Sequence, residues 1–305
     1  MKLGIAVVYL VREGNERLLD LHLESIKRHT GVPYVIYASV NRLAAGMRDR
    51  LARRPEVRAI EVPGTELTKS EEHAYYLERL IAAALDDGVS HVAVFHVDSF
   101  PIRPGWAQEI SAALSERRPF AAAVRDTQWD YKPFTAFMLM QAEFLRERRP
   151  RFLLDGEERR SAAYPRYRRR FPHHPDSGVG FGLLAHREGL AWLPLERSNR
   201  GEDHAHFGSI YGDTVFHLGA AAWRRKDFPG SRGPTGLLDL RARLAPVLGR
   251  ALPGRARRAL KGWMSRAVPA LDIEAKYAAN EAAFEAVRQR LLADPDAYLA
   301  HLRFG

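Results

Sequence analysis

The chain of 305 residues is long enough for one large domain or for a domain with an appendage. Hydrophobic residues make up 46% of it and charged residues 28%, which predicts a buried core and excludes global disorder, collagen and pure coiled coil. The chain has no cysteine, so disulfides, thiolate metal sites and a cysteine nucleophile are also excluded.

The formal net charge of +10 lies in one late segment. Residues 221–270 hold 12 Lys or Arg and 2 Asp, which leaves 35 basic and 35 acidic residues in the rest of the chain. Aromatic residues are sparse there, which disfavours specific nucleic-acid binding. We expect a solvated basic face, and an anionic membrane surface or another polyanion is the alternative partner of this segment.

No targeting or membrane-spanning segment is predicted. The longest apolar runs, such as residues 4–10, are too short to cross a bilayer, and no small-residue cleavage site follows the first of them. We therefore expect a cytoplasmic protein, with attachment to the inner membrane face through its basic segment as an alternative.

The first 125 residues alternate between strand and helix patterns. Apolar or β-branched runs predict strands at residues 3–10, 34–39, 57–62, 91–96 and 120–124. Helical spacing of apolar residues predicts helices around Leu19–Ile26, Leu77–Leu85 and Trp106–Leu114. Thr68 and Glu71 predict a capping box for the second helix, and Gly88 predicts its C-terminal cap. The alternation indicates an α/β fold with a mostly parallel sheet flanked by helices.

The remaining chain is less regular. Residues 146–170 lack a clear period and are predicted to be a loop or an insertion on the acceptor side of a site. Residues 177–189 are predicted helical, followed by a short strand at 189–193. The turn-rich stretch 229–236 predicts a boundary between a domain at residues 1–228 and a helical, basic extension at 229–305. A last short helix should start at Asp294-Pro295.

A His-x-Asp pair ends the strand predicted at 91–96. His96 and Asp98 are two residues apart, so in an extended chain their side chains point the same way. The carboxyl edge of a parallel sheet is where ligands bind, and a carboxylate there can hold a divalent cation. The alternative is structural, with Asp98 capping the following turn and His96 satisfied at the sheet end.

The segment FHVDSFPIRPGW resembles the D-x-D segment of bacterial, family-2-like GT-A nucleotide-sugar glycosyltransferases. On this register Asp98 matches the metal-binding Asp, and His96 replaces the first Asp. Ser70 and His73 lie in a stretch that resembles the helix before that strand. The resemblance implies a GT-A-like, Rossmann-like fold and assigns Ser70, His73, His96 and Asp98 to the donor nucleotide site.

Two downstream segments extend the resemblance to about residues 3–219. The stretch 176–189 resembles the family's Glu-Asp helix, which places Asp176 at the general base and Pro175 where a Glu is usual. The stretch 215–219 resembles the strand end whose His, here His217, closes the metal and diphosphate site. Asp176 also suits a helix N-cap, and one residue can serve both purposes.

The resemblance implies a hexosyltransferase that moves a sugar from a nucleoside diphosphate donor to a hydroxyl of a glycan, lipid or small molecule. Asp176 would act as base in an inverting reaction, and Asp98 and His217 would hold Mn²⁺ or Mg²⁺. The stereochemistry is left open between inverting and retaining. Because His96 and Pro175 replace acidic residues, a non-catalytic protein that binds nucleotides, polyanions or a membrane surface is the alternative.

Other clusters carry weaker signals. Residues 202–206 contain two carboxylates and two histidines, which we interpret as a solvated or acceptor-facing loop rather than a metal site. Phe134, Phe137, Met138 and Met140 are expected in the core. Phosphate-loop and nucleophile-elbow motifs are absent from the sequence, so those two chemistries have no support.

Overall fold

A computed structural model describes residues 1–10, 15–125, 127, 130–201, 204, 207–219 and 269–305. The chain divides into two compact units, one of Met1–Ala221 with Arg290–Gly305 and the other of Ala222–Gln289. The predicted boundary after residue 228 and nearly all of the basic segment 221–270 lie outside the described residues, so both stay predictions.

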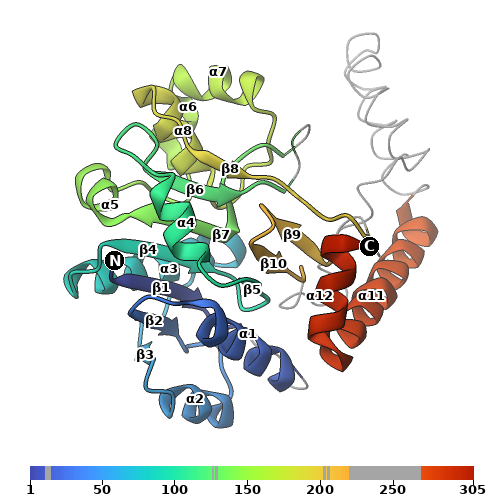
Figure 1. The fold of residues 1–305 in the computed structure, drawn as a ribbon. Coiled ribbons are helices and arrows are strands. Elements are labelled where there is room, and N and C mark those ends of the chain that lie inside the picture. The colour runs from blue at the N-terminus through green and yellow to red at the C-terminus, as the bar shows by residue number, and fades with distance from the viewer. Residues whose placement is uncertain (11–14, 126, 128–129, 202–203, 205–206, 220–268) are drawn as a thin grey trace. The chain divides into compact units, whose positions relative to one another are not determined.

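Seven strands of the first unit form one sheet in the order β3-β2-β1-β4-β7-β6-β8 (Figure 1). They are β1 (Leu3–Val8), β2 (Tyr34–Ser39), β3 (Val57–Ile60), β4 (His91–Phe95), β6 (Phe120–Ala123), β7 (Phe134–Gln141) and β8 (Leu193–Leu195). Neighbouring strands pair in parallel, except that β7 runs antiparallel to both β4 and β6. The predicted α/β fold with a mostly parallel sheet is confirmed.

Helices cover both faces of this sheet, which is why its central strands are continuously apolar. All six residues of β1 are buried, and successive side chains enter opposite cores. One core includes residues of α1 (Glu16–His29), α2 (Ala45–Ala52) and α4 (Trp106–Ala112), and the other includes residues of α3 (Lys69–Asp86), α5 (Ala142–Arg148) and α8 (Val179–Glu188). The helices contribute residues at helical spacing to these cores, such as Leu19, Leu23 and Ile26 of α1.

The start of α3 differs from the prediction. Thr68 is the N-cap residue, but its side chain makes no capping hydrogen bond, so the predicted capping box with Glu71 is wrong. Lys69, the first helical residue, has a left-handed backbone with φ +56°, which departs from the regular first turn that a capping box needs. Gly88 does adopt the predicted positive φ, at +69°, just after the helix.

Residues 146–170 are largely helical, so a loop is wrong for this stretch, and the alternative of an insertion on the acceptor side stays a prediction. The stretch holds the end of α5, then α6 (Gly156–Arg160) and α7 (Ala163–Arg170). A capping box starts α6, in which Asp155 accepts from the Glu158 N–H and the Glu158 side chain accepts from the Asp155 N–H. The Asp-x-x-Glu spacing of Asp155 and Glu158 is the sequence signal for this capping box. The many arginines of this stretch hide the apolar periodicity of its helices.

The hydrophobic pattern missed one further strand and misplaced another. The Phe134–Met140 cluster is buried, as predicted, but it also forms the long strand β7. The strand expected at 189–193 instead begins at Leu193, because Gly189 ends α8 with φ +64° and the next residues complete the turn.

A second sheet joins distant segments in the antiparallel order β5-β10-β9. Its strands are β5 (Ser99–Pro101), β9 (Ser209–Tyr211) and β10 (Val215–His217). This small sheet connects the chain leaving β4 to residues more than a hundred positions later. It therefore decides which side chains meet at the carboxyl end of β4.

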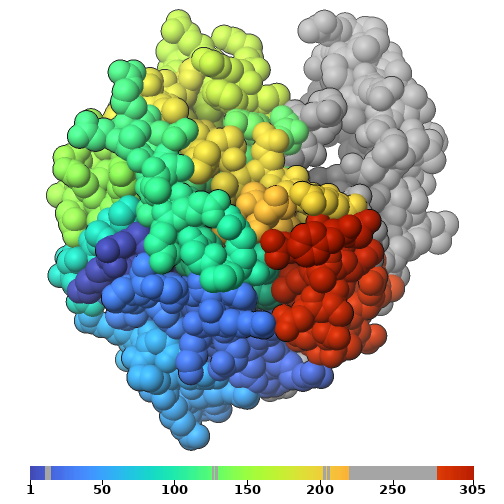
Figure 2. Space-filling model, in the orientation of Figure 1, coloured from blue at the N-terminus to red at the C-terminus, as the bar shows by residue number. Residues whose placement is uncertain are grey.

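The chain ends in α11 (Pro269–Ala293) and α12 (Pro295–Phe304). The predicted start of the last helix is confirmed, since the Asp294 side chain accepts from the Ala297 N–H at 3.0 Å. Helix α12 lies beside α1 (Figure 2), where Asp296 pairs with Arg28 at 3.1 Å. In the described part of the chain, no helix is both long and apolar enough to cross a membrane.

Candidate active site

Backbone pairing within the second sheet brings His217 to Asp98. After β4 ends at Phe95, the chain turns through residues 96–98 and enters β5, which pairs antiparallel with β10. In that register His217 lies opposite Ser99, and the Leu218 N–H donates to the Asp98 carbonyl oxygen at 2.9 Å. Two residues far apart in the sequence thus become neighbours through main-chain hydrogen bonds.

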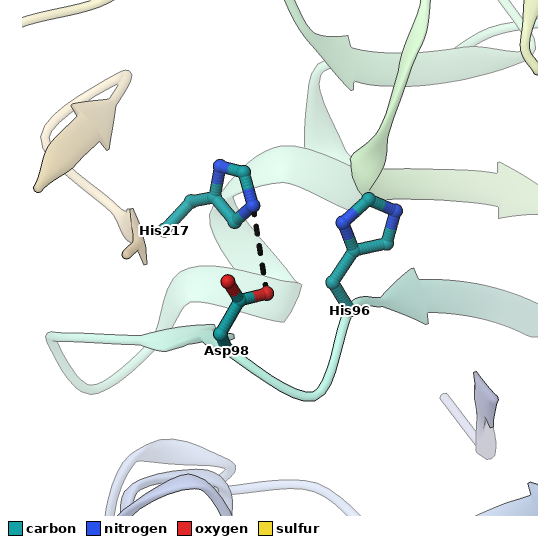
Figure 3. Close-up of side chains that lie close together, drawn as sticks. All are labelled: His96, Asp98 and His217. Carbon is teal, nitrogen blue, oxygen red and sulfur yellow. Dashed lines mark ion pairs between the residues drawn. The ribbon is translucent and has the colours of Figure 1, made fainter. Parts of the chain in front are cut away.

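His96, Asp98 and His217 form a three-residue cluster (Figure 3). Each offers one ligand atom, and these atoms all lie within 4.8 Å of one another. His217 Nε2 lies 3.5 Å from Asp98 Oδ1. Two ligands that each lie about 2.1 Å from one ion in tetrahedral geometry are about 3.4 Å apart. The donor set and its spacing therefore fit a divalent metal ion.

A hydrogen bond orients the His96 ring. Its Nε2 lies 3.1 Å from the Thr135 hydroxyl, and its other nitrogen, Nδ1, faces the gap between Asp98 and His217 (Figure 3). Donation from Nε2 to Thr135 leaves the Nδ1 lone pair available as a ligand. The His96 main-chain N–H donates to the Ser99 hydroxyl at 2.8 Å, so Ser99 supplies the side-chain acceptor in this turn.

Hydrogen bonds continue from this cluster to Asp176. The Thr135 hydroxyl lies 3.2 Å from the Ser177 hydroxyl, and the Ser177 main-chain N–H donates to Asp176 Oδ1 at 2.7 Å. The Ser70 hydroxyl donates to the same carboxylate oxygen at 2.5 Å. Asp176 is therefore held from two sides, by the segment before α8 and by the first turn of α3.

Helix α3 supplies a second contact to the cluster. His73 is one turn beyond Ser70, and its ring packs edge-on against His96 with centroids 5.2 Å apart. Burial lowers the pKa of His73 to about 4, so this ring is neutral at pH 7. The pKa of His96 is also lowered, well below its usual range, by burial and by the neighbouring histidines. All six residues predicted for the site thus lie in one connected region.

Three charged residues that the sequence analysis missed lie close to this region. Lys132 and Asp130 are 0% and 1% exposed and form a buried ion pair at 3.2 Å. Arg125 lies 3.7 Å from Asp130 and stacks on Phe134, whose ring contacts both His96 and His217. These are residues after β6 and before β7, and no sequence pattern indicated that both strand ends meet here.

The charge of Asp176 is set by opposing effects. Burial raises the pKa of its carboxyl group, but the Ser70 hydrogen bond and the positive charge of Lys132 outweigh burial, so the pKa lies below its ordinary value. Asp176 is ionised at neutral pH as a result. The N-cap of α8 is Gly178, so the interpretation of Asp176 as the helix N-cap is wrong.

Three glycines allow the segment after Asp176 to pack this closely. A Cβ on Gly178, whose φ is +96°, would lie 1.9 Å from the Pro133 carbonyl oxygen. A Cβ on Gly180 would lie 2.1 Å from the Arg151 carbonyl oxygen, and one on Gly182 would lie 2.0 Å from the Tyr167 hydroxyl. The Gly-x-Gly-x-Gly spacing was the available sequence signal for this close approach.

The other candidates from the sequence lie outside the cluster or outside the described residues. Residues 202, 203, 205 and 206 are not among the described residues, and His204 stacks on Phe207 with ring centroids 4.6 Å apart. Asp213, four residues before His217, occupies a turn with φ +54° before β10 and is not part of the cluster of His96, Asp98 and His217.

Comparison with known proteins leaves the function to be argued from this geometry. No protein-family model matches the sequence, and no curated protein matches it. Among solved structures, mouse xyloside xylosyltransferase 1 in its apo form is similar at 10% identity and TM-score 0.39, covering 64% of this chain and 85% of that one. A protein from Desulfovibrio desulfuricans G20, described as a proposed nucleotide-diphospho-sugar transferase, is similar at 12% identity and TM-score 0.38, covering 64% and 79%.

A third similar structure is S. aureus TarS in complex with UDP-GlcNAc, at 9% identity and TM-score 0.37, covering 52% of this chain and 51% of that one. Likenesses of this size carry no conclusion about activity. The arrangement of His96, Asp98, His217 and Asp176 in this chain has to carry it.

Proposed function

We propose that the protein is a glycosyltransferase that moves a sugar from a nucleoside diphosphate donor to a hydroxyl acceptor. The observation that supports this is a chain of contacts in which His96 meets the Thr135 hydroxyl, Thr135 meets the Ser177 hydroxyl, and the Ser177 main-chain N–H donates to Asp176. It joins a cation-binding cluster to an ionised carboxylate at the carboxyl edge of the sheet. A metal-dependent, inverting glycosyl transfer uses both, one group for the diphosphate and one for the acceptor hydroxyl.

In this proposal Asp176 is the general base of an inverting reaction. Its carboxylate takes the proton of the acceptor hydroxyl while that oxygen forms a bond to the anomeric carbon, and the bond from this carbon to the diphosphate oxygen breaks. General bases contribute about 10²–10⁴-fold to the rate. Because the pKa of Asp176 is lowered, it is a weak base that stays available across neutral pH, so we expect the lower end of that range.

The other residues bind and orient. His96, Asp98 and His217 would hold a divalent ion, which when bound neutralises the charge that develops on the leaving diphosphate. Ser70 and the Ser177 main chain position the carboxylate of Asp176. Lys132 keeps that carboxylate ionised, and His73 supports the ring of His96. Binding of an anionic membrane surface by residues 221–270 stays a prediction.

The test is release of free nucleoside diphosphate from a panel of sugar donors, combined with calorimetry of nucleoside diphosphates with and without Mn²⁺. We expect Asp176→Asn to lower turnover about 100-fold while donor binding is kept. Asp98→Ala should remove metal-dependent nucleotide binding. Asp213→Asn is the matched control, because it makes the same change in a left-handed turn that asparagine tolerates.

Full turnover in both Asp176→Asn and Asp98→Ala would contradict the site assignment. A chain that binds nucleoside diphosphate but never releases it from any donor would be the non-catalytic protein. Salt-sensitive binding to anionic vesicles without nucleotide binding would instead favour the polyanion-binding alternative.

A further inference from the structure

We propose that His96, Asp98 and His217 select Zn²⁺ or Co²⁺ over Mg²⁺ and Ca²⁺. The inference concerns the metal position of the proposed function and deepens it. Its starting point is the donor set, which contains two imidazole nitrogens and one carboxylate oxygen. That set differs from the all-oxygen surroundings in which Mg²⁺ and Ca²⁺ bind well.

Ligand chemistry gives the first argument. Imidazole nitrogen binds Zn²⁺, Co²⁺ and other first-row ions well, whereas Mg²⁺ and Ca²⁺ prefer carboxylate, carbonyl and water oxygens. Two imidazoles and one carboxylate with open positions are the protein ligands of several catalytic transition-metal sites. In the cluster that the described residues form here, Asp98 supplies the one carboxylate.

Charge gives the second argument. Hard cations depend on the number of negative ligands, and this cluster offers a single carboxylate. The guanidinium of Arg125 stacks on the Phe134 ring, which contacts both His96 and His217, so a positive charge lies beside the cluster and weakens its attraction for any cation. An ion that binds nitrogen ligands poorly would therefore be held weakly here. The affinity of an ion for imidazole nitrogen then decides whether it binds.

Ring orientation gives the third argument. The Thr135 hydroxyl lies 3.1 Å from His96 Nε2 and directs Nδ1 into the gap beside Asp98 and His217 (Figure 3). Partners of this kind fix the tautomer and the direction of a histidine ligand, and their loss costs about 10–100-fold in metal affinity. The Thr135 contact therefore holds the His96 ring with Nδ1 facing the other two ligands. This orientation suits His96 to bind a metal ion through nitrogen.

The test measures metal binding to the untagged full chain without nucleotide or sugar. After treatment with a chelator, the protein is titrated by calorimetry with Zn²⁺, Co²⁺, Mg²⁺ and Ca²⁺, and the change in the visible absorption of Co²⁺ reports its coordination by the protein. We expect Zn²⁺ and Co²⁺ to bind at least about 100-fold more tightly than Mg²⁺. Equal affinities for Zn²⁺, Co²⁺ and Mg²⁺ would overturn the proposal.

Three variants test which side chains select the ion. His217→Ala should abolish Zn²⁺ and Co²⁺ binding, and Thr135→Val should weaken it about tenfold without removing a ligand. His96→Asp should lower the preference for Co²⁺ over Mg²⁺ at least about tenfold, because an oxygen and a negative charge replace a nitrogen. His91→Ala, at the opposite end of β4, is the control that removes one histidine outside the cluster.

The outcomes separate this inference from the proposed function. Unchanged Zn²⁺ and Co²⁺ binding in both His217→Ala and His96→Asp overturns the inference, even if nucleoside diphosphate binds. Selective Zn²⁺ and Co²⁺ binding that these variants remove supports the inference, even if no sugar donor is ever turned over. Circular dichroism of each variant shows whether a loss of binding comes from unfolding, and a folded His96→Asp protein alone suffices for the decision.

Discussion

The two sides of the candidate site are held in different ways. On the metal side, Asp98 and His217 are brought together by main-chain pairing of β5 with β10, which depends little on the side chains around it. On the base side, Asp176 is held by the Ser70 hydroxyl, the Ser177 main chain and the charge of Lys132, and by glycines that permit close packing. We therefore expect the base side to be the more sensitive to single substitutions.

The largest effect should come from Gly178→Ala. The added Cβ would lie 1.9 Å from the Pro133 carbonyl oxygen, and the backbone at φ +96° is unfavourable for alanine. Overpacking and left-handed strain together should lower the free energy of unfolding by about 5 kcal/mol, measured by urea denaturation. Gly189→Ala is the control, since its φ is +64° but no atom lies within 4 Å, and it should lose only about 1 kcal/mol. Equal losses would contradict the close-packing argument.

Lys132→Met should have the next largest effect. It leaves Asp130 buried without its lysine, and Arg125 at 3.7 Å compensates only in part, so we expect a loss of about 3 kcal/mol, at the low end for a broken buried pair. The pKa of Asp176 should rise at the same time, which moves the acid limb of the turnover profile to higher pH. A double variant that also carries Asp130→Asn should recover part of the stability, and no recovery would argue against the pair.

On the metal side, His22 predicts a pH dependence of stability. Its ring is fully buried beneath β5, with Nδ1 2.9 Å from the Ser99 carbonyl oxygen, and burial lowers its pKa to about 4. The unfolded chain binds a proton below about pH 6.5 and the folded chain does not, so stability falls as pH drops from 6.5 towards 4. Between pH 7 and 5 this histidine accounts for about 2 kcal/mol.

Denaturation of His22→Asn at several pH values tests this pH dependence of stability. Asparagine keeps a donor for the Ser99 carbonyl oxygen and does not titrate, so the variant should lose less stability between pH 7 and 5 than the parent protein does. Above pH 7 the two profiles should run parallel. Parallel profiles down to pH 5 would show that His22 is not the titrating group.

The smallest effect is expected from Ser70→Ala. It removes one hydrogen bond to Asp176, which should cost about 1 kcal/mol of stability and raise the pKa of that carboxyl group. The acid limb of the turnover profile should move up while turnover at pH 8 changes little. Ser111→Ala on α4 makes the same change away from the site and should leave the profile in place.

Local pattern was sufficient where burial alone determines structure. The apolar runs at residues 3–10 and 91–96 and the helical spacing around Leu77–Leu85 predicted β1, β4 and α3, because a strand or helix buried in a layered fold must carry that period. The pattern failed for residues 146–170, where many exposed arginines hide the few apolar contacts, and for β7, whose largely apolar residues fit a core of either kind.

The candidate residues show the same division. His96 and Asp98 lie on one short segment, so the sequence alone places them near each other, but the chain turns through residues 96–98 and the predicted extended geometry is wrong. Thr135, Ser177 and Lys132 were missed because each is an ordinary polar residue whose importance depends on its neighbours in space. The resemblance to a known family pointed to Asp176 and His217. His217 joins the cluster because β10 pairs with β5, and Asp176 lies beside the cluster because α8 packs closely.

By itself, the sequence determined the alternating layers of the first half of the chain and the His-x-Asp pair at the end of β4, because hydrophobic period and strand geometry are local properties. Only the tertiary structure decided that His217 faces Asp98, that Asp176 reaches Ser70, and that a buried Lys132 stands near that carboxylate. Those contacts join residues up to about 120 positions apart, and only pairing and packing of whole elements can bring such residues together.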